Sequence, residues 1–122
     1  MSDIIVERGD PDEAQDLYKA RQVGETLEKH YPGHPWIVSF QGRVLVVRHY
    51  EINEFVKRNL GRDGFGFVLH HLKSYSATQL AHDAMIAGGQ ILEAFGIPRG
   101  AWRGAEPMLP PGFEYKRPET FQ

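Results

Sequence analysis

The chain has 122 residues, a formal net charge of −2 and no cysteine. This length suits one domain with a core of its own, and the small net charge creates no overall field that attracts nucleic acid or an anionic membrane. The absence of cysteine excludes disulfides, thiol nucleophiles and thiolate metal sites, and it favours synthesis in a reducing cytoplasm. No apolar run approaches the length of a membrane span.

The first elements expected along the chain are a short apolar strip and a long helix. The strip Ile4-Ile5-Val6 is either an edge strand or a loose N-terminal arm, residues 1–9. Asp10 suits the N-cap of a helix, with Pro11 at its first position and Glu13 at the third. Pro32-Gly33 ends this helix. Its apolar residues follow helical spacing and leave one face polar; they are Leu17, Ala20, Leu27 and Tyr31.

Residues 36–50 predict a β-hairpin. They contain two runs of β-branched and aromatic residues separated by Gln41-Gly42, and glycine suits a tight primed turn. This turn would pair Val38 with Leu45 and Trp36 with Val47. Both faces of the predicted hairpin are apolar, whereas a hairpin with one solvated side alternates apolar and polar residues. We therefore expect each face to be covered. The second face carries Ile37, Val44, Val46 and Tyr50, interrupted by Ser39 and Arg48.

A short helix, a third strand and a second long helix follow. Apolar spacing predicts a helix over 52–60 that ends near Gly61, and residues 65–70 read as a strand. Ser76 and Gln79 have the spacing of a capping box, and the helix that they open ends at Gly96. The predicted order is αββ(α)βα. We therefore expect an α+β domain over 10–96, in which two long helices pack on one face of a three-stranded antiparallel meander.

Residues 97–122 differ in kind from this domain. Five prolines and three glycines make regular structure unlikely there. Disordered tails are usually poor in aromatic residues, yet this segment has several. We therefore predict an extended C-terminal arm that docks on a protein surface, either its own domain or that of a neighbour. The predicted partner-binding anchors are Trp102, Phe113, Tyr115 and Phe121.

Two adjacent glycines, Gly88 and Gly89, lie inside the second long helix, where each costs about 1 kcal/mol relative to alanine. Small residues are tolerated where a backbone approaches closely. One explanation is a second contact face on this helix, which would also account for Ile86 beside it. The other is tight packing on the sheet. The sequence leaves both open.

The sequence carries no catalytic or metal-binding signature. His70 and His71 are adjacent and point to opposite faces of a strand, and Pro32-Gly33 interrupts the spacing of His30 and His34. There is no H-E-x-x-H and no G-x-S-x-G. We predict a protein that is not an enzyme and needs no cofactor or metal. The default reading for all six histidines is a hydrogen-bonded or surface side chain; they are His30, His34, His49, His70, His71 and His82.

A basic cluster supports an alternative function in nucleic-acid binding. The order α-β-β-β-α is also that of the double-stranded-RNA-binding domain, whose second long helix starts with a Lys-rich motif. Here only Lys73 lies near that position, so the topology agrees and the chemistry does not. An adaptor of this kind would use the basic residues Arg43, Arg48, Lys57, Arg58 and Arg62.

Two strings, Tyr31-Pro-Gly-His34 and Gly66-Phe-Val-Leu-His70, lie in a stretch of about residues 10–100 that resembles small structural proteins of tailed-phage virions. The first belongs to the longer string His30–Trp36. The resemblance implies a non-enzymatic subunit, present in many copies in a particle and made in the host cytoplasm. Its expected partners are further copies of itself or other virion proteins, with no membrane. Extended arms suit this role, because they let a small subunit bury a large area against neighbours.

Overall fold

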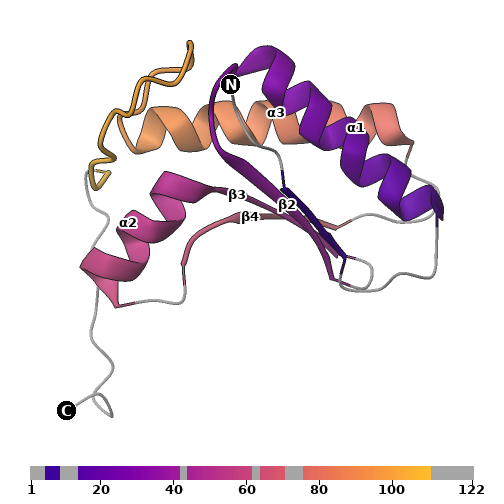
Figure 1. Ribbon diagram of the computed structural model, residues 1–122, viewed down its shortest axis with the longest axis horizontal. Helices are drawn as coiled ribbons and strands as arrows, with labels where there is room; N and C mark the ends of the chain where they lie inside the picture. The colour runs from indigo at the N-terminus through magenta and orange to yellow at the C-terminus, as the bar shows by residue number, and fades with distance from the viewer. Residues whose placement is uncertain (1–4, 9–13, 42–43, 62–63, 71–75, 111–122) are drawn as a thin grey trace.

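The computed structural model describes residues 5–8, 14–41, 44–61, 64–70 and 76–110. These residues form a sheet with two long helices on one of its faces and a shorter helix near one end of it (Figure 1). None of the described helices combines the length and apolar character needed to cross a membrane. The elements, in chain order, are β1 (Ile5–Arg8), α1 (Ala14–His30), β2 (Trp36–Gln41), β3 (Val44–His49), α2 (Tyr50–Leu60), β4 (Phe67–His70) and α3 (Ala77–Ala94).

The sheet has the order β1-β2-β3-β4. Strands β2, β3 and β4 pair antiparallel and form the predicted meander, so the α+β class and the predicted order are confirmed. Strand β1 pairs parallel with β2 in the register Ile5 to Ile37, and α1 makes the crossover between them. Of the two alternatives for the N-terminal strip, residues 5–8 therefore take the edge strand rather than a loose arm. Residues 9–13, with the predicted N-cap Asp10, lie outside the described part of the chain.

The hairpin pairs in a register two residues away from the one predicted. Val38 lies opposite Val47, Phe40 opposite Leu45 and Gln41 opposite Val44, so residues 42 and 43 connect the strands instead of 41 and 42. A shift of two keeps every residue on its predicted face, because side chains alternate with a period of two. Tyr50 is the exception. It is the first residue of α2 and belongs to neither strand.

The core lies between the inner face of the sheet and the helices α1 and α3 (Figure 1). The helical stripes predicted from the sequence point into it, and Phe67 and Leu69 of β4 pack against its edge. The buried core residues include Ala20, Val23, Leu27, Tyr31, Trp36, Val38, Leu45, Val47, Ile52, Val56, Leu60, Leu80, Ala84, Leu92, Phe95 and Ile97.

Both ends of α3 follow from local sequence. Ser76 and Gln79 form the predicted capping box, in which each side chain bonds the backbone N–H of the other residue. At the other end Gly96 has a φ of 70°, which glycine adopts without a Cβ penalty. The N–H of Gly96 donates to the carbonyl of Glu93, and that of Ile97 donates to Leu92, which is a Schellman motif. The chain therefore leaves α3 with Ile97 already turned into the core.

The two glycines of α3 allow close packing within the domain. A Cβ on Gly88 would lie 3.0 Å from Leu27 and 3.3 Å from Trp36, and one on Gly89 would lie 2.6 Å from the hydroxyl of Tyr31. That hydroxyl donates a hydrogen bond to the carbonyl of Met85. Packing against α1, the turn after it and Trp36 thus accounts for both glycines without an external partner.

The outer face of the sheet carries none of the three helices (Figure 1). Val68 is 49% exposed there and lies directly opposite Val46 on β3. Ile37 and Val44 are half-buried. Arg48 donates to the hydroxyl of Ser39 at 3.4 Å and forms the polar part of this face. Val46 is only 6% exposed. We call Ile37, Val44, Val46 and Val68 the outer apolar face.

Candidate functional site

The turn between α1 and β2 positions the first member of a buried histidine pair. Gly33 has a φ of 82°, and its N–H donates to the carboxylate of Glu28 at 3.4 Å. A Cβ on Gly33 would lie 3.1 Å from the backbone nitrogen of Trp102, so this glycine also allows a distant segment to approach. The turn directs His34 inward, where its side chain is fully buried.

The second member, His49, comes from the end of β3. Its side chain is 2% exposed and is the N-cap of α2. Nδ1 of His34 lies 3.0 Å from Nε2 of His49, and Nε2 of His34 lies 2.8 Å from the carbonyl oxygen of Gly100. The N–H of Ile52 donates to Nδ1 of His49 at 3.4 Å. We call this chain of three hydrogen bonds, from Ile52 through His49 and His34 to Gly100, the histidine relay.

The two ends of the relay fix the tautomer of each ring. The N–H of Ile52 can only donate, so Nδ1 of His49 accepts. The carbonyl of Gly100 can only accept, so Nε2 of His34 carries a hydrogen. A neutral imidazole has one donor and one acceptor, so Nε2 of His49 donates to Nδ1 of His34. Both rings are therefore neutral, with the proton on Nε2.

The surroundings of the pair favour this neutral state. Trp36 and Trp102 pack on both histidines, with ring centroids 5.2 to 6.0 Å apart. Burial and, as the smaller effect, the neighbouring His34 together lower the pKa of His49 to about 3. Burial also lowers the pKa of His34, against the opposing effects of the Gly100 and Pro98 carbonyls and of Glu28.

The segment that covers the pair is residues 97–110, which we call the C-terminal strap. The N–H of Trp102 donates to the carbonyl of Pro32 at 3.0 Å, and that of Met108 donates to Phe95 at 2.8 Å. Ile97 and Pro107 are buried. The strap therefore packs on its own domain as far as the backbone of Met108, so the compact unit extends beyond the predicted boundary at 96. The predicted anchor Trp102 binds in cis.

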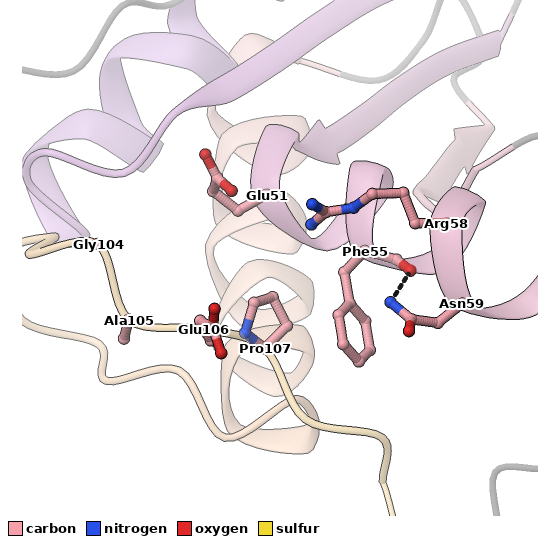
Figure 2. A pocket seen from close by; sticks show the side chains of 8 residues that line it. All are labelled: Glu51, Phe55, Arg58, Asn59, Gly104, Ala105, Glu106 and Pro107. Carbon is pink, nitrogen blue, oxygen red and sulfur yellow. Dashed lines mark hydrogen bonds between the residues drawn. The ribbon is translucent and has the colours of Figure 1, made fainter.

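A pocket of about 500 Å³ separates the strap from α2. Figure 2 shows Phe55 and Pro107 close together in it, with Arg58 and Glu51 on the α2 side and Glu106 on the strap. The amide of Asn59 donates to the carbonyl of Phe55 at 2.9 Å. The other lining residues are Gly104 and Ala105. The two walls of the pocket thus belong to the two elements that the histidine relay joins.

The other residues predicted for binding do not form one site in the described structure. Arg48 lies on the outer face of the sheet, while Lys57 pairs with Glu54 at 3.5 Å on α2. Arg58 donates to the carbonyl of Glu54 at 3.4 Å and lines the pocket. Five predicted residues lie outside the described part of the chain: Arg43, Arg62, Phe113, Tyr115 and Phe121.

The histidine relay was not predicted, although the sequence held a signal for it. His34 is separated from Trp36 and Val38 by even numbers of residues, and so is His49 from Leu45 and Val47 on the facing strand. Strand alternation therefore places both histidines on the inner face once the hairpin is accepted. The described residues contain no group of three His, Asp or Glu side chains placed to hold a metal ion.

Comparison with models of protein families, with curated proteins and with solved structures finds no match for this chain.

Proposed function

We propose that this protein is a non-enzymatic structural subunit, used in many copies in the virion of a tailed phage, and that it assembles with further copies of itself through the outer apolar face. The observation that carries the proposal is this face. A half-covered sheet normally alternates apolar and polar residues, but here aliphatic side chains lie on both sides. Of its four residues, Val68 is exposed, Ile37 and Val44 are half-buried and Val46 is buried. Exposed apolar surface of this kind commonly marks contacts with other proteins when it is contiguous.

A second copy is the occupant that the chain itself favours. The described domain ends at Pro110, and twelve residues follow it. Fully extended, twelve residues span about 40 Å, which is enough to reach a neighbouring subunit. They include the three remaining predicted anchors, Phe113, Tyr115 and Phe121. Aromatic side chains of this kind supply much of the binding energy at protein interfaces.

The resemblance to virion proteins is the reason why we propose a virion as the assembly that contains this subunit. In the structure, three of the residues in the resembling strings stabilise the fold. Tyr31 bonds the backbone of α3, His34 belongs to the relay, and Gly66 lies where a Cβ would meet Arg48 at 2.7 Å. Motifs that shape the domain agree with a role in packing rather than in chemistry.

The test is size-exclusion chromatography with light scattering. It compares the full chain with two variants, each substituted at a position of similar exposure. Val68→Asp places a charge on the outer apolar face. Ile86→Asp is the matched control, because Ile86 is 46% exposed on α3. We expect the full chain to be oligomeric, V68D to shift to the monomer and I86D to keep the parent mass.

The 1–110 truncation tests the tail separately, because it keeps every described contact of the strap. We expect it to fold and to assemble more weakly than the full chain. A monomeric full-length protein at all concentrations contradicts assembly with its own copies, and an unchanged mass for V68D contradicts the outer apolar face as the contact. Mass shifts that are equal for V68D and I86D would indicate a general loss of structure.

A further inference from the structure

The histidine relay has no position for an additional proton. Its three hydrogen bonds use three protons, one from Ile52, one from His49 and one from His34. A fourth proton on either ring sets two N–H groups against each other, either between the two rings or between His49 and Ile52, because the carbonyl of Gly100 only accepts. Water does not reach the pair, because both side chains are buried. A buried donor that loses its acceptor costs about 1–3 kcal/mol. The relay must therefore break where the excess proton meets another N–H.

We propose that the histidine relay is a proton-operated latch, which ties the C-terminal strap to the start of α2 and opens when one histidine takes up a proton. An added proton breaks either the contact between the two rings, at 3.0 Å, or the contact between Ile52 and His49, at 3.4 Å, and either break separates the strap end of the relay from α2. The contact with Gly100 is the shortest, at 2.8 Å, and it holds the strap. This inference stands independently of the proposed assembly role.

The groups around the relay set the direction in which it responds. On α1, Glu28 faces His34, and one of its carboxylate oxygens is buried with no hydrogen-bond partner among the described residues. Its negative charge attracts a proton to His34, as do the carbonyls of Gly100 and Pro98 in the strap. Among the described residues, the rings of Tyr31, Trp36 and Trp102 and the backbone of α2 also contact the pair. Burial outweighs these attractions and keeps the closed latch neutral.

Either break removes the tie that the relay makes between α2 and the strap, and the strap is the element whose packing can then loosen. Its described residues belong to no helix or strand, and the relay supplies one of its few links to the domain. Segments with few backbone hydrogen bonds are the ones that open locally, without unfolding of the whole domain. Residues Gly104–Pro107 and α2 form the two walls of the pocket in Figure 2, and opening separates these walls. Acid therefore changes the shape of this surface while α1, α3 and the sheet stay packed.

The experiment follows the full-length protein by NMR from pH 7.5 to pH 4.5. Nitrogen-15 spectra of the imidazoles report the tautomer and charge of His34 and His49. Hydrogen exchange reports the protection of the Trp102 amide, which bonds Pro32 in the closed state. An opened His49 regains the ordinary pKa of 6.5, against about 3 when closed. Below pH 6.5 the opening equilibrium then increases about tenfold per pH unit. We expect both rings to be neutral with the proton on Nε2 at pH 7.5, and Trp102 to lose protection about 100-fold by pH 4.5 while the amides of α3 keep theirs.

Two matched substitutions isolate the latch. His49→Asn keeps a side-chain oxygen able to cap α2 but removes the N–H that opposes a proton on His34. We expect the effect of pH on Trp102 protection to fall below about tenfold in this variant. His82→Asn changes an exposed histidine of α3 and should leave the 100-fold effect intact.

Three results overturn the latch. They are an Nδ1–H tautomer or a charged ring at pH 7.5, loss of Trp102 protection only together with α3, and an equal pH effect in H49N. If H49N does not fold, the titration of the parent protein decides alone. Retained Trp102 protection at pH 4.5 contradicts the latch, and selective loss supports it.

Discussion

At the scale of single residues, the histidine pair shows how neutral imidazoles act as structural groups. His49 caps α2 where Ser, Thr, Asp or Asn is usual, and it can do so only while Nδ1 is unprotonated. His34 extends the same chain of hydrogen bonds to the strap, 66 residues further along the sequence. The pair therefore gives the fold a dependence on pH that its small net charge does not suggest.

The free energy of unfolding should fall as the pH falls below 6.5. The unfolded chain protonates His49 with an ordinary pKa of 6.5, whereas the folded pKa is about 3. Between these values the unfolded state binds more protons, so acid favours unfolding. From pH 7.5 to pH 5.5 we expect a loss of about 1.4 kcal/mol from His49 alone, and His34, whose pKa is also lowered, adds to it.

Urea denaturation at the two pH values measures this loss. The interval lies above the range in which ordinary carboxylates titrate, so their contribution is small. Equal free energies of unfolding at pH 7.5 and pH 5.5 would mean that the histidines are not held neutral by burial.

At the scale of the elements, the contact between α1 and α3 depends on the glycines of α3. Alanine at position 89 gains up to about 1 kcal/mol of helix propensity, but its Cβ would lie 2.6 Å from the Tyr31 hydroxyl. Tyr31 is buried and bonded to Met85, so it cannot move away freely. We expect Gly89→Ala to destabilise the protein by about 1 kcal/mol, because overpacking costs about 1–3 kcal/mol.

A double-mutant cycle identifies the cause of this cost. Tyr31→Phe removes the hydroxyl that the new methyl group meets. In that background we expect Gly89→Ala to be less destabilising by at least about 1 kcal/mol, measured as free energies of unfolding in urea. Equal costs in both backgrounds would place the clash elsewhere, for example at Arg99, whose guanidinium also lies near Gly89.

At this scale, the sequence predicts the features that depend on local interactions. The capping box of Ser76 and Gln79, the end of α3 at Gly96 and the faces of the hairpin each depend on residues a few positions apart. The hairpin register was wrong by two residues, because alternation defines the face of a residue but not its opposite partner. The parallel pairing of β1 and the docking of the strap depend on contacts between distant residues, for which no periodic pattern exists.

At the scale of the whole molecule, the strap completes the domain rather than extending from it. It covers the end of the core at Ile97 and Trp102 and closes the histidine relay at Gly100. Composition alone could not reveal this, since a segment rich in proline and aromatic residues suits docking in cis and in trans equally. The structure separates the two parts of the predicted arm. Residues 97–108 bond and pack on their own domain, while the exposed side chains of Met108 and Leu109 and the tail from 111 onward stay candidates for contact with a neighbour.

Truncation at two positions should therefore have unequal effects on stability. Chain 1–110 keeps the strap, and we expect its free energy of unfolding to lie within about 0.5 kcal/mol of the full chain under conditions where both are monomeric. Chain 1–96 loses the burial of Ile97 and Trp102 and exposes His34. Complete burial of one large apolar side chain contributes about 1.5–3 kcal/mol, so we expect a loss of more than about 3 kcal/mol. Urea denaturation followed by circular dichroism measures both.

A loss of this size approaches the total stability of many small domains, so chain 1–96 can fail to fold at all. Trp102→Ala in the full chain then tests the same contact more gently. We expect it to cost about 2–4 kcal/mol, because Trp102 packs on both histidines and on the core. Arg103→Ala, at the exposed position beside it, is the matched control and should change stability by less than about 0.5 kcal/mol. Equal stabilities for W102A and the parent chain would show that the strap lies on the domain without contributing to its fold, and the domain boundary would then return to residue 96.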